Sequence, residues 1–414
     1  MIREDSTVYS NGPLVGIRVA DFGQFVAGPA VGQHLADLGA TVVKVEPLEG
    51  ESSRNGGLYG EAMVRTNNRD KLGLAVDLRR REGVEVAKRL VEKSDVVIQN
   101  MRPATMERLG LGPERARSLN PRVVYLSITA FGKGAPPTRP GFDIAAQAES
   151  GIMSVTGEAG GEPQRVGFTV VDTATSYVAT NAVLAALFRR ERTGEGAVID
   201  TSLLAVAVHL QGPNWVGWFT SGVEPTRKGN GQPTAAPAAE LVSVRDGYIV
   251  LSAYTPEHWR RLCTAIDRAD MIDDARFASN DARLAHRAEM RSELSGALAS
   301  LTQRQAIEML SSNGIVAGAV RSYSQVLESE DVQRLALFPT AEMNGMGTYR
   351  YAEQPFSISG MEHRTSKAAP AVGQDTRAVL DGLGYDPDSV ESLLASCVVG
   401  EVNVDQPGEE AFSR

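Results

Sequence analysis

The first half of the chain alternates strand-like and helix-like segments at short spacing, and this alternation limits the fold more than any other feature. β-branched and apolar residues fill five short runs, at 16–22, 41–46, 73–78, 95–99 and 123–129. Segments with helical periodicity separate them, at 29–38, 82–93 and 113–119. Such runs are typical of strands that are buried on both faces. The pattern therefore predicts an α/β fold with a mainly parallel sheet and right-handed crossovers.

Later segments indicate more than one domain, as expected for 414 residues. A long apolar helix is predicted at about 172–192, and 197–204 resembles a further strand that leads into a helix. Prolines and glycines crowd the segment 222–237, which predicts a loop and a domain boundary. Beyond it we expect a strand at 247–253 and amphipathic helices within 256–312.

Charge and cysteine content exclude several classes of protein. The 51 acidic and 42 basic side chains give a net charge of −9, which argues against a general nucleic-acid or anionic-membrane binder. The two cysteines, Cys263 and Cys397, form no disulfide framework, and neither they nor the five histidines have metal-ligand spacing. No export signal or membrane-spanning run is apparent, so we expect a cytoplasmic protein without a metal site.

The turn after the first strand is a candidate ligand site. Residues 23–29 (GQFVAGP) lead into a helix, whose first N–H groups can bind a phosphate. Glu46 ends the next strand, where a dinucleotide-binding fold places its ribose-binding acid. G-x-G-x-x-G is absent, and glycines that permit close packing of strand and helix explain the turn equally well. An NAD-dependent oxidoreductase stays open as a weak alternative.

Basic and amide side chains follow several predicted strands. Lys71, Asn100, Arg102 and Arg108 lie at or after strand ends, where open α/β sheets bind ligands. Cations at that edge can hold an anionic ligand despite the negative total charge. Each one alone is more often a solvated surface charge.

Asp172 stands at the start of the long apolar helix. An acid at this position ordinarily caps the helix. A poorly solvated carboxylate is also a competent nucleophile toward a thioester, and Asp143 and Glu149 are rival acids nearby in the sequence. Neither G-x-S-x-G nor a P-loop motif is present, which disfavours an ordinary hydrolase or NTPase.

Together these segments resemble the family III CoA-transferases, the CaiB/BaiF group that includes formyl-CoA transferase and carnitine CoA-transferase. The matching stretches occur in the family's order, at 12–29, 35–47, 67–83, 99–112, 119–136, 140–157, 182–204 and 369–385. The resemblance implies a large Rossmann-like domain built from 1–221 and 336–414, with a smaller α/β domain at 222–335. It also implies a ring-shaped monomer that interlocks with a second copy as a homodimer.

The same resemblance assigns roles to individual residues. It implies that Asp172 attacks an acyl-CoA, that CoA then passes to a small carboxylic acid, and that Asp143 is an acid near the substrate. The loop 229–233, with Gly231 and Gln232, resembles the glycine-rich loop that closes over the active site. The implied CoA contacts are Val26, Ala27, Lys71, Asn100, Met101, Arg102 and Arg108.

Some positions depart from the family pattern. Formyl-CoA transferase has a glutamine where this chain has Val26, with Gln24 two residues earlier, and a glutamate that matches the shorter Asp143. These differences argue against formyl-CoA and oxalate as the substrate pair. The main alternative is an α-methylacyl-CoA racemase, which needs two bases on opposite faces of the α-carbon. Racemases have Gly-His-Asp where this chain has Gly141-Phe142-Asp143, and phenylalanine cannot move a proton.

Overall fold

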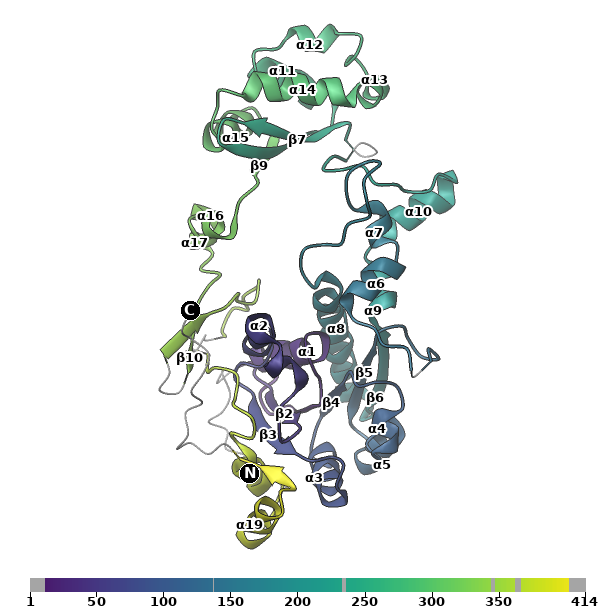
Figure 1. Cartoon of the computed structure of the whole chain (residues 1–414), viewed down its shortest axis with the longest axis vertical. Coiled ribbons are helices and arrows are strands. Elements are labelled where there is room, and N and C mark those ends of the chain that lie inside the picture. The colour runs from purple at the N-terminus through teal and green to yellow at the C-terminus, as the bar shows by residue number, and fades with distance from the viewer. Residues whose placement is uncertain (1–11, 137, 233–235, 344–346, 362–365, 402–414) are drawn as a thin grey trace. The chain divides into compact units, whose positions relative to one another are not determined.

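The chain forms two compact units in a computed structural model, which describes residues 12–136, 138–232, 236–343, 347–361 and 366–401 (Figure 1). The large unit contains Met1–Ser150, Gly167–Gly212 and Ala336–Arg414, and the small unit contains Gly151–Val166 and Pro213–Leu335. The chain thus returns to the large unit at Ala336. The predicted boundary at 222 differs, because 151–166 and 213–221 belong to the small unit.

A seven-stranded sheet forms the centre of the large unit, in the order β12-β3-β2-β1-β4-β5-β6. Its strands are β1 (Arg18–Asp21), β2 (Thr41–Glu46), β3 (Leu72–Val76), β4 (Val96–Gln99), β5 (Val124–Thr129), β6 (Ala197–Ser202) and β12 (Val399–Gly400). β12 pairs antiparallel with β3, and the other pairs are parallel. The α/β fold with a large parallel sheet is therefore confirmed.

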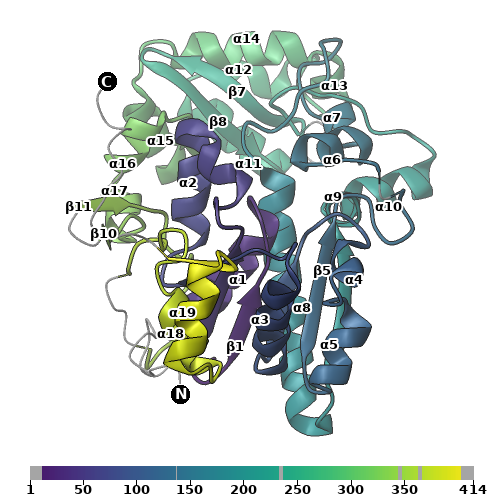
Figure 2. The ribbon, with the colours of Figure 1, turned by 60° about the horizontal axis from the view of Figure 1, so that its bottom comes forward.

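Helices cover both faces of this sheet. The helices of the large unit are α1 (Ala27–Asp37), η2 (Ser52–Asn55), α2 (Gly57–Asn67), α3 (Arg81–Glu92), α4 (Thr105–Arg108), α5 (Pro113–Leu119), α6 (Asp143–Glu149), α8 (Val170–Thr193), α9 (Leu203–His209), α18 (Thr376–Gly382) and α19 (Pro387–Ala395). A hairpin of β10 (Thr340–Met343) and β11 (Gly347–Arg350) completes the unit. In Figure 2, α18 and α19 lie on the same side of the sheet as α3.

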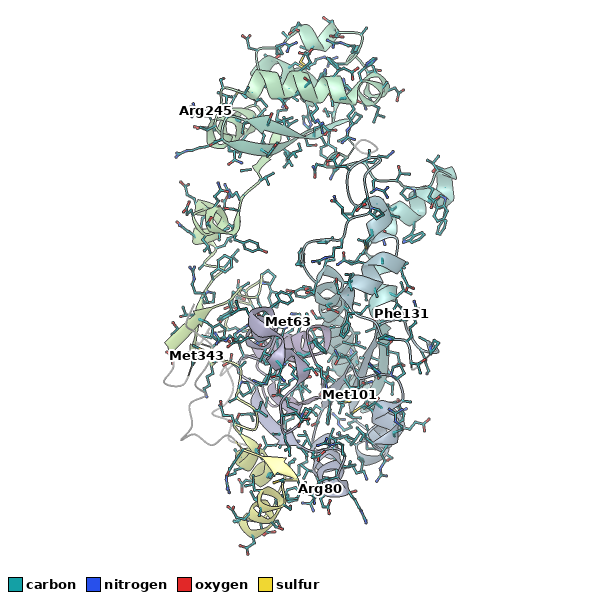
Figure 3. The ribbon with its side chains drawn as sticks, in the orientation of Figure 1. Met63, Arg80, Met101, Phe131, Arg245 and Met343 are labelled. Carbon is teal, nitrogen blue, oxygen red and sulfur yellow. The ribbon has the colours of Figure 1, made fainter. Side chains whose placement is uncertain are left out.

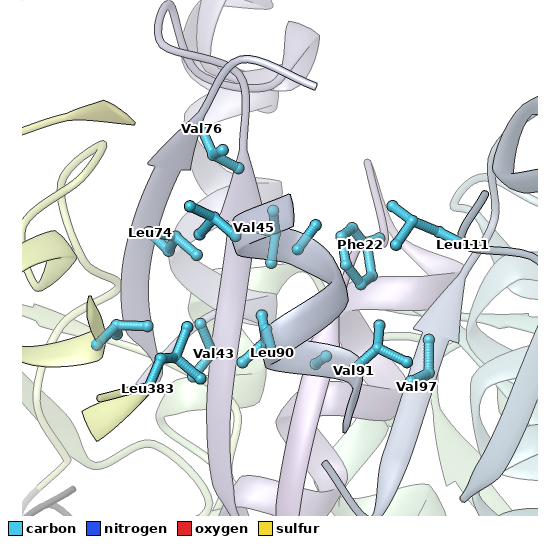
Figure 4. Packing of buried hydrophobic residues seen from close by; sticks show 14 of the residues in the cluster. Phe22, Val43, Val45, Leu74, Val76, Leu90, Val91, Val97, Leu111 and Leu383 are labelled. Carbon is cyan, nitrogen blue, oxygen red and sulfur yellow. The ribbon is translucent and has the colours of Figure 1, made fainter. Parts of the chain in front are cut away.

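The core explains why the two ends of the chain join. Figure 4 shows Val43, Val45 and Leu74 from the sheet packed with Leu90 from α3 and Leu383 from the C-terminal segment. All five side chains are almost fully buried. Because burial of a large aliphatic side chain contributes about 1.5–3 kcal/mol, this core holds the returning segment against β3 and α3.

Helix α8 packs against α1 and α9. It begins at Val170, close to the expected start, and ends at Thr193, after which Gly194 adopts the left-handed conformation. In the part of the chain that the structure describes, it is the one helix long and apolar enough to span a membrane by length and composition. One such helix is weak evidence for a membrane span, since the core helix of a soluble protein passes the same test.

The small unit has a three-stranded antiparallel sheet, β7 (Ala238–Val244), β8 (Gly247–Ala253) and β9 (Val316–Ala319). Its helices are α7 (Ile152–Val155), α10 (Gly212–Ser221), α11 (Pro256–Ala265), α12 (Asp270–Asp273), α13 (Asn280–Ala285), α14 (Arg287–Leu298), α15 (Gln303–Ser312), α16 (Tyr323–Leu327) and α17 (Glu330–Arg334). The expected strand at 247–253 coincides with β8, and α11 to α15 occupy the region where amphipathic helices were predicted.

Candidate active site

A pocket of about 370 Å³ opens at the carboxyl edge of the parallel sheet in the large unit. Its lining comes mainly from the segments after β1 (24–27), β4 (100–103) and β5 (130–132), together with Asp172 from α8. β1 and β4 are neighbours in the sheet, and β2 lies on the other side of β1. The pocket therefore lies at the point where the strand order reverses, which is where open α/β sheets bind ligands.

The turn after β1 contributes one wall of the pocket, and its N–H groups already have protein acceptors. Gly23 N donates to Asp21 Oδ1 (2.8 Å), Gln24 N to Asn100 Oδ1 (2.8 Å) and Phe25 N to Glu51 Oε2 (3.0 Å). The three N–H groups of residues 23–25 are thus not available to a phosphate. The phosphate contact was predicted for the N–H groups at the start of α1, and it stays a prediction. The glycines serve close packing, because a Cβ on Gly23 would lie 2.8 Å from the backbone nitrogen of Pro29.

Five of the predicted CoA contacts line the pocket, namely Val26, Ala27, Asn100, Met101 and Arg102. Figure 3 labels Met101 together with Phe131, another residue of the lining. The structure brings these five residues together from two separate segments of the chain, as the predicted site requires. Their contact with CoA itself stays a prediction.

Arg108 and Lys71 do not join this group. Arg108 is exposed on α4, outside the pocket lining, and donates to Thr105 Oγ1 (3.1 Å). The Lys71 side chain is fully buried, and its ammonium donates to Asp21 Oδ2 (2.7 Å), Pro29 O (2.8 Å) and Asn68 Oδ1 (2.9 Å). With three protein acceptors, the Lys71 ammonium has no donor left for a phosphate. The prediction of Lys71 as a phosphate contact does not agree with this geometry.

Asp172 lies in the first turn of α8 without capping it. The capping acceptor is Asp143, whose Oδ1 accepts from Val171 N (2.7 Å) and Asp172 N (3.2 Å). Gln147 Nε2 donates to the other oxygen of Asp143. Within the described residues, the Asp172 carboxylate has no hydrogen bond or ion pair, and it lines the pocket. The ordinary explanation of Asp172 as a helix cap is therefore wrong.

Two effects perturb the ionisation of Asp172. Burial disfavours its charged form, and the nearby Asp143 carboxylate adds repulsion, so that the pKa of Asp172 rises from 3.8 to about 7. An acid with a strongly raised pKa in a cleft is typical of functional sites. Near neutral pH a large share of this carboxylate is ionised yet poorly solvated.

The pocket also contains residues that the sequence did not single out, such as Phe131 and Arg139, beside Phe142 of the Gly141-Phe142-Asp143 segment. The Arg139 guanidinium lies 3.6 Å from the ring centroid of Phe131 and forms an ion pair with Glu149. Glu149 itself is not part of the lining, whereas its rival Asp172 is. The segment 130–142 has no periodicity, so only its position after β5 and its overlap with the family-like stretches 119–136 and 140–157 could have indicated a site.

Gly231 and Gln232 belong to the small unit. A Cβ on Gly231 would lie 2.6 Å from Glu240 Oε1 and 2.9 Å from Ala239 O, so the position accepts only glycine without rearrangement. Gln232 Oε1 accepts a hydrogen bond from Tyr254 Oη (3.0 Å). The rest of the predicted glycine-rich loop includes 233, which lies outside the described residues. Closure of this loop over Asp172 stays a prediction.

Among the residues that the structure describes, no group of three or more His, Cys, Asp or Glu side chains is arranged to hold a metal ion. This observation does not test the expectation of a site without a metal ion.

Several known proteins are similar to this chain over most of its length. A family model described as CoA-transferase family III matches residues 14–376. A relative from Mycobacterium tuberculosis, the probable fatty acyl-CoA transferase Rv3272, is 40% identical over 333 residues, which cover 77% of this chain and 84% of the relative. The succinate–glutarate CoA-transferase of Agrobacterium fabrum is 34% identical over 380 residues, which cover 89% of this chain and 95% of the relative.

Solved structures are similar over the same region. The crystal structure of a CAIB/BAIF family protein from Brucella suis matches with a TM-score of 0.82 and 31% identity, covering 90% of this chain and 100% of that chain. Nothing in these matches supports the NAD-dependent alternative.

Proposed function

Because the chain belongs to CoA-transferase family III, and is therefore an acyl-CoA:carboxylate CoA-transferase, we propose that it moves CoA through covalent intermediates on Asp172. The observation that carries the proposal is the state of this carboxylate. It lines the pocket at the carboxyl edge of the sheet, it has no protein partner among the described residues, and its pKa is raised to about 7. Poor solvation makes it a stronger nucleophile than an ordinary aspartate.

The reaction conserves the thioester energy through four exchanges. An oxygen of ionised Asp172 attacks the acyl carbon of the donor, the C–S bond breaks, and CoA leaves as a thiolate from a mixed anhydride. The thiolate attacks the Asp172 carbonyl carbon and expels the donor acid as its carboxylate, which leaves an aspartyl-CoA thioester. The acceptor carboxylate attacks the same carbon and releases the thiolate. The thiolate then attacks the acyl carbon of the acceptor and returns Asp172 as a carboxylate.

The lining of the pocket suits an acyl-CoA. Arg102 and Arg139 supply positive charge for the phosphates, and guanidinium groups bind phosphate in a bidentate manner. Phe25, Phe131 and Phe142 supply apolar surface for pantetheine and the acyl carbons. The donor and acceptor are proposed to be an acyl-CoA and a small carboxylic acid, since relatives of this chain carry names such as succinate–glutarate CoA-transferase.

We also propose that the protein is a cytoplasmic homodimer. Sedimentation of the purified chain tests the assembly, and a monomer at micromolar concentration would contradict it.

Trapping of the intermediates tests the mechanism directly. The enzyme is mixed with succinyl-, acetyl- or formyl-CoA, treated with hydroxylamine and digested, and mass spectrometry locates the modified residue. We expect a hydroxamate at Asp172, and we expect Asp172→Ala to lose CoA exchange. Asp388→Asn removes an exposed acid on α19 and serves as the matched control. Wild-type transfer by Asp172→Ala would refute the nucleophile, and Asp172-dependent deuterium exchange at the α-carbon would favour the racemase.

A further inference from the structure

We propose that the buried Lys44–Glu51 pair positions Phe25 in the wall of the active-site pocket, and so acts on acyl-CoA binding without touching the substrate. The inference rests on the proposed function of this pocket. It assigns a positioning role to two residues that lie behind the turn and outside the pocket lining. The contacts that carry it all lie within the large unit.

Lys44 is a charged residue in a place where an apolar side chain is the ordinary choice. It lies on β2 between Val43 and Val45, in a strand buried along most of its length, and its side chain is fully buried. Its ammonium donates to Gly23 O and lies 3.4 Å from Glu51 Oε2. A buried ammonium is unfavourable unless a partner compensates it, so a lysine at this position requires an explanation. The hydrogen bond to Gly23 O explains the lysine, because it fixes the turn after β1.

Glu51 holds the other side of the same turn. Its Oε2 accepts from Phe25 N (3.0 Å), and its side chain is 1% exposed. The backbone N–H of Glu51 donates to Glu46 Oε1 (3.1 Å), and Arg54 binds both oxygens of Glu46 (2.7 and 2.8 Å). The contact with Glu46 therefore fixes the position of Glu51 independently of the turn after β1.

Phe25 is the residue whose conformation these contacts decide. Its φ of +63° lies in the left-handed region, which a phenylalanine adopts only where its surroundings impose it. The ring then meets Phe142 edge to face, with ring centroids 5.3 Å apart. Phe142 precedes Asp143, whose carboxylate accepts from the backbone N–H of Asp172. A continuous set of contacts thus joins the buried pair to the turn that carries the nucleophile.

Loss of the Lys44 charge is expected to release this turn. Gly23 O would lose its donor, and Glu51 would stay buried without its cation. Phe25 would return to a right-handed or extended conformation, and its ring would leave Phe142. A displacement of about 1 Å in a site can cost about 100-fold, so we expect kcat/KM for the acyl-CoA to fall by roughly 10–100-fold. Because Phe25 supplies an apolar wall that contacts the ligand, the loss should appear mainly in KM.

The experiment compares Lys44→Met with Arg190→Met. Arg190 is a matched control because it is another buried cation of the large unit, paired with the partly exposed Asp95 (3.0 Å), at the far end of α8 from Asp172. Both variants should lose stability, and only Lys44→Met should raise KM. The double variant Lys44→Met with Glu51→Gln should have a KM between those of Lys44→Met and wild type. The glutamine still accepts a hydrogen bond from Phe25 N and leaves no unpaired buried charge.

A second measurement needs neither activity nor a stable Lys44 variant. Amide hydrogen exchange at 23–26 should be faster in Glu51→Gln than in wild type, while exchange in β5 stays unchanged. Phe25→Gly should keep the left-handed turn and raise KM through loss of the ring. Unchanged exchange, or an equal KM effect in Arg190→Met, would overturn the positioning role. Absence of CoA transfer by the wild type would instead refute the proposed function, and the exchange data would still decide the role of the pair.

Discussion

Replacement of Asp172 by asparagine should stabilise the protein at alkaline pH and leave its stability nearly unchanged at acidic pH. The pKa of Asp172 is 3.8 in the unfolded chain and about 7 in the fold. Between these values the folded state binds a proton that the unfolded state does not. Stability from this group is therefore complete below about pH 4 and is lost as the pH rises through about 7. The asparagine side chain does not ionise, so the Asp172→Asn variant escapes that loss.

The magnitude follows from the difference between the two pKa values of Asp172. About three pH units at ~1.4 kcal/mol each give a limit of about 4 kcal/mol in the free energy of unfolding. The carboxylate lines an open pocket, where water screens part of the cost, so roughly half of this limit is expected. Between pH 5 and pH 8 only the two pH units from 5 to 7 contribute, so Asp172→Asn should be about 1.4 kcal/mol more stable than wild type at pH 8, relative to their difference at pH 5.

Thermal unfolding at pH 5, 6, 7 and 8 measures this effect. Because the chain has two units, calorimetry must separate their transitions, and the shift belongs to the large unit. Asp388→Asn, which removes an exposed acid, should show no comparable pH dependence. An equal difference between Asp172→Asn and wild type at pH 5 and pH 8 would refute the reasoning, because Asp172 would then ionise with an ordinary pKa.

Further predictions concern the neighbours of Asp172 and the small unit. In kinetic assays, kcat should rise with pH around 7, and Asp143→Asn should move that rise to lower pH, since it removes a repulsive charge beside Asp172; a profile that stays in place would contradict the electrostatic role of Asp143. Arg139→Gln should raise KM for acyl-CoA about 10-fold by loss of a charge-assisted hydrogen bond, whereas Arg108→Gln, outside the pocket, should change KM little; equal effects would contradict the assigned lining. Gly231→Ala should destabilise the small unit by about 1–3 kcal/mol in denaturant unfolding, and an unchanged midpoint would show that its neighbours yield freely.

The sequence predicted the sheet better than the contacts beneath it. Short apolar runs specify buried parallel strands almost on their own, and the run at 41–46 coincides with β2. The same run contains Lys44. The sequence pattern assigns Lys44 to a strand, but it does not indicate which groups bind its buried ammonium. Glu51 and Gly23, its two partners, lie in loops at other positions of the chain. Side-chain pairing between distant loops has no periodicity, so only the folded structure reveals it.

Lys71 shows the same limit at the candidate site. Lys71 directly precedes β3, at the amino end of that strand, and a free cation was expected there because most lysines are exposed. In the structure, the Lys71 ammonium is buried and donates to Asp21 Oδ2, at the end of β1 (2.7 Å). A position at a strand end predicts that a side chain is near an edge of the sheet. It does not predict toward which side of the strand the charge is directed.

The two acids of the site divide their tasks through the geometry of α8. A helix start needs acceptors for its unpaired N–H groups, and Asp172, in the first turn, is well placed to supply one. Asp143, which lies on α6, supplies the acceptor instead, since its carboxylate accepts hydrogen bonds from both Val171 N and Asp172 N. Had Asp172 capped the helix, hydrogen bonds from N–H groups would have lowered its pKa and occupied its oxygens. The capping by Asp143 therefore leaves Asp172 unpartnered and places a negative charge beside it, and both effects favour a reactive carboxylate.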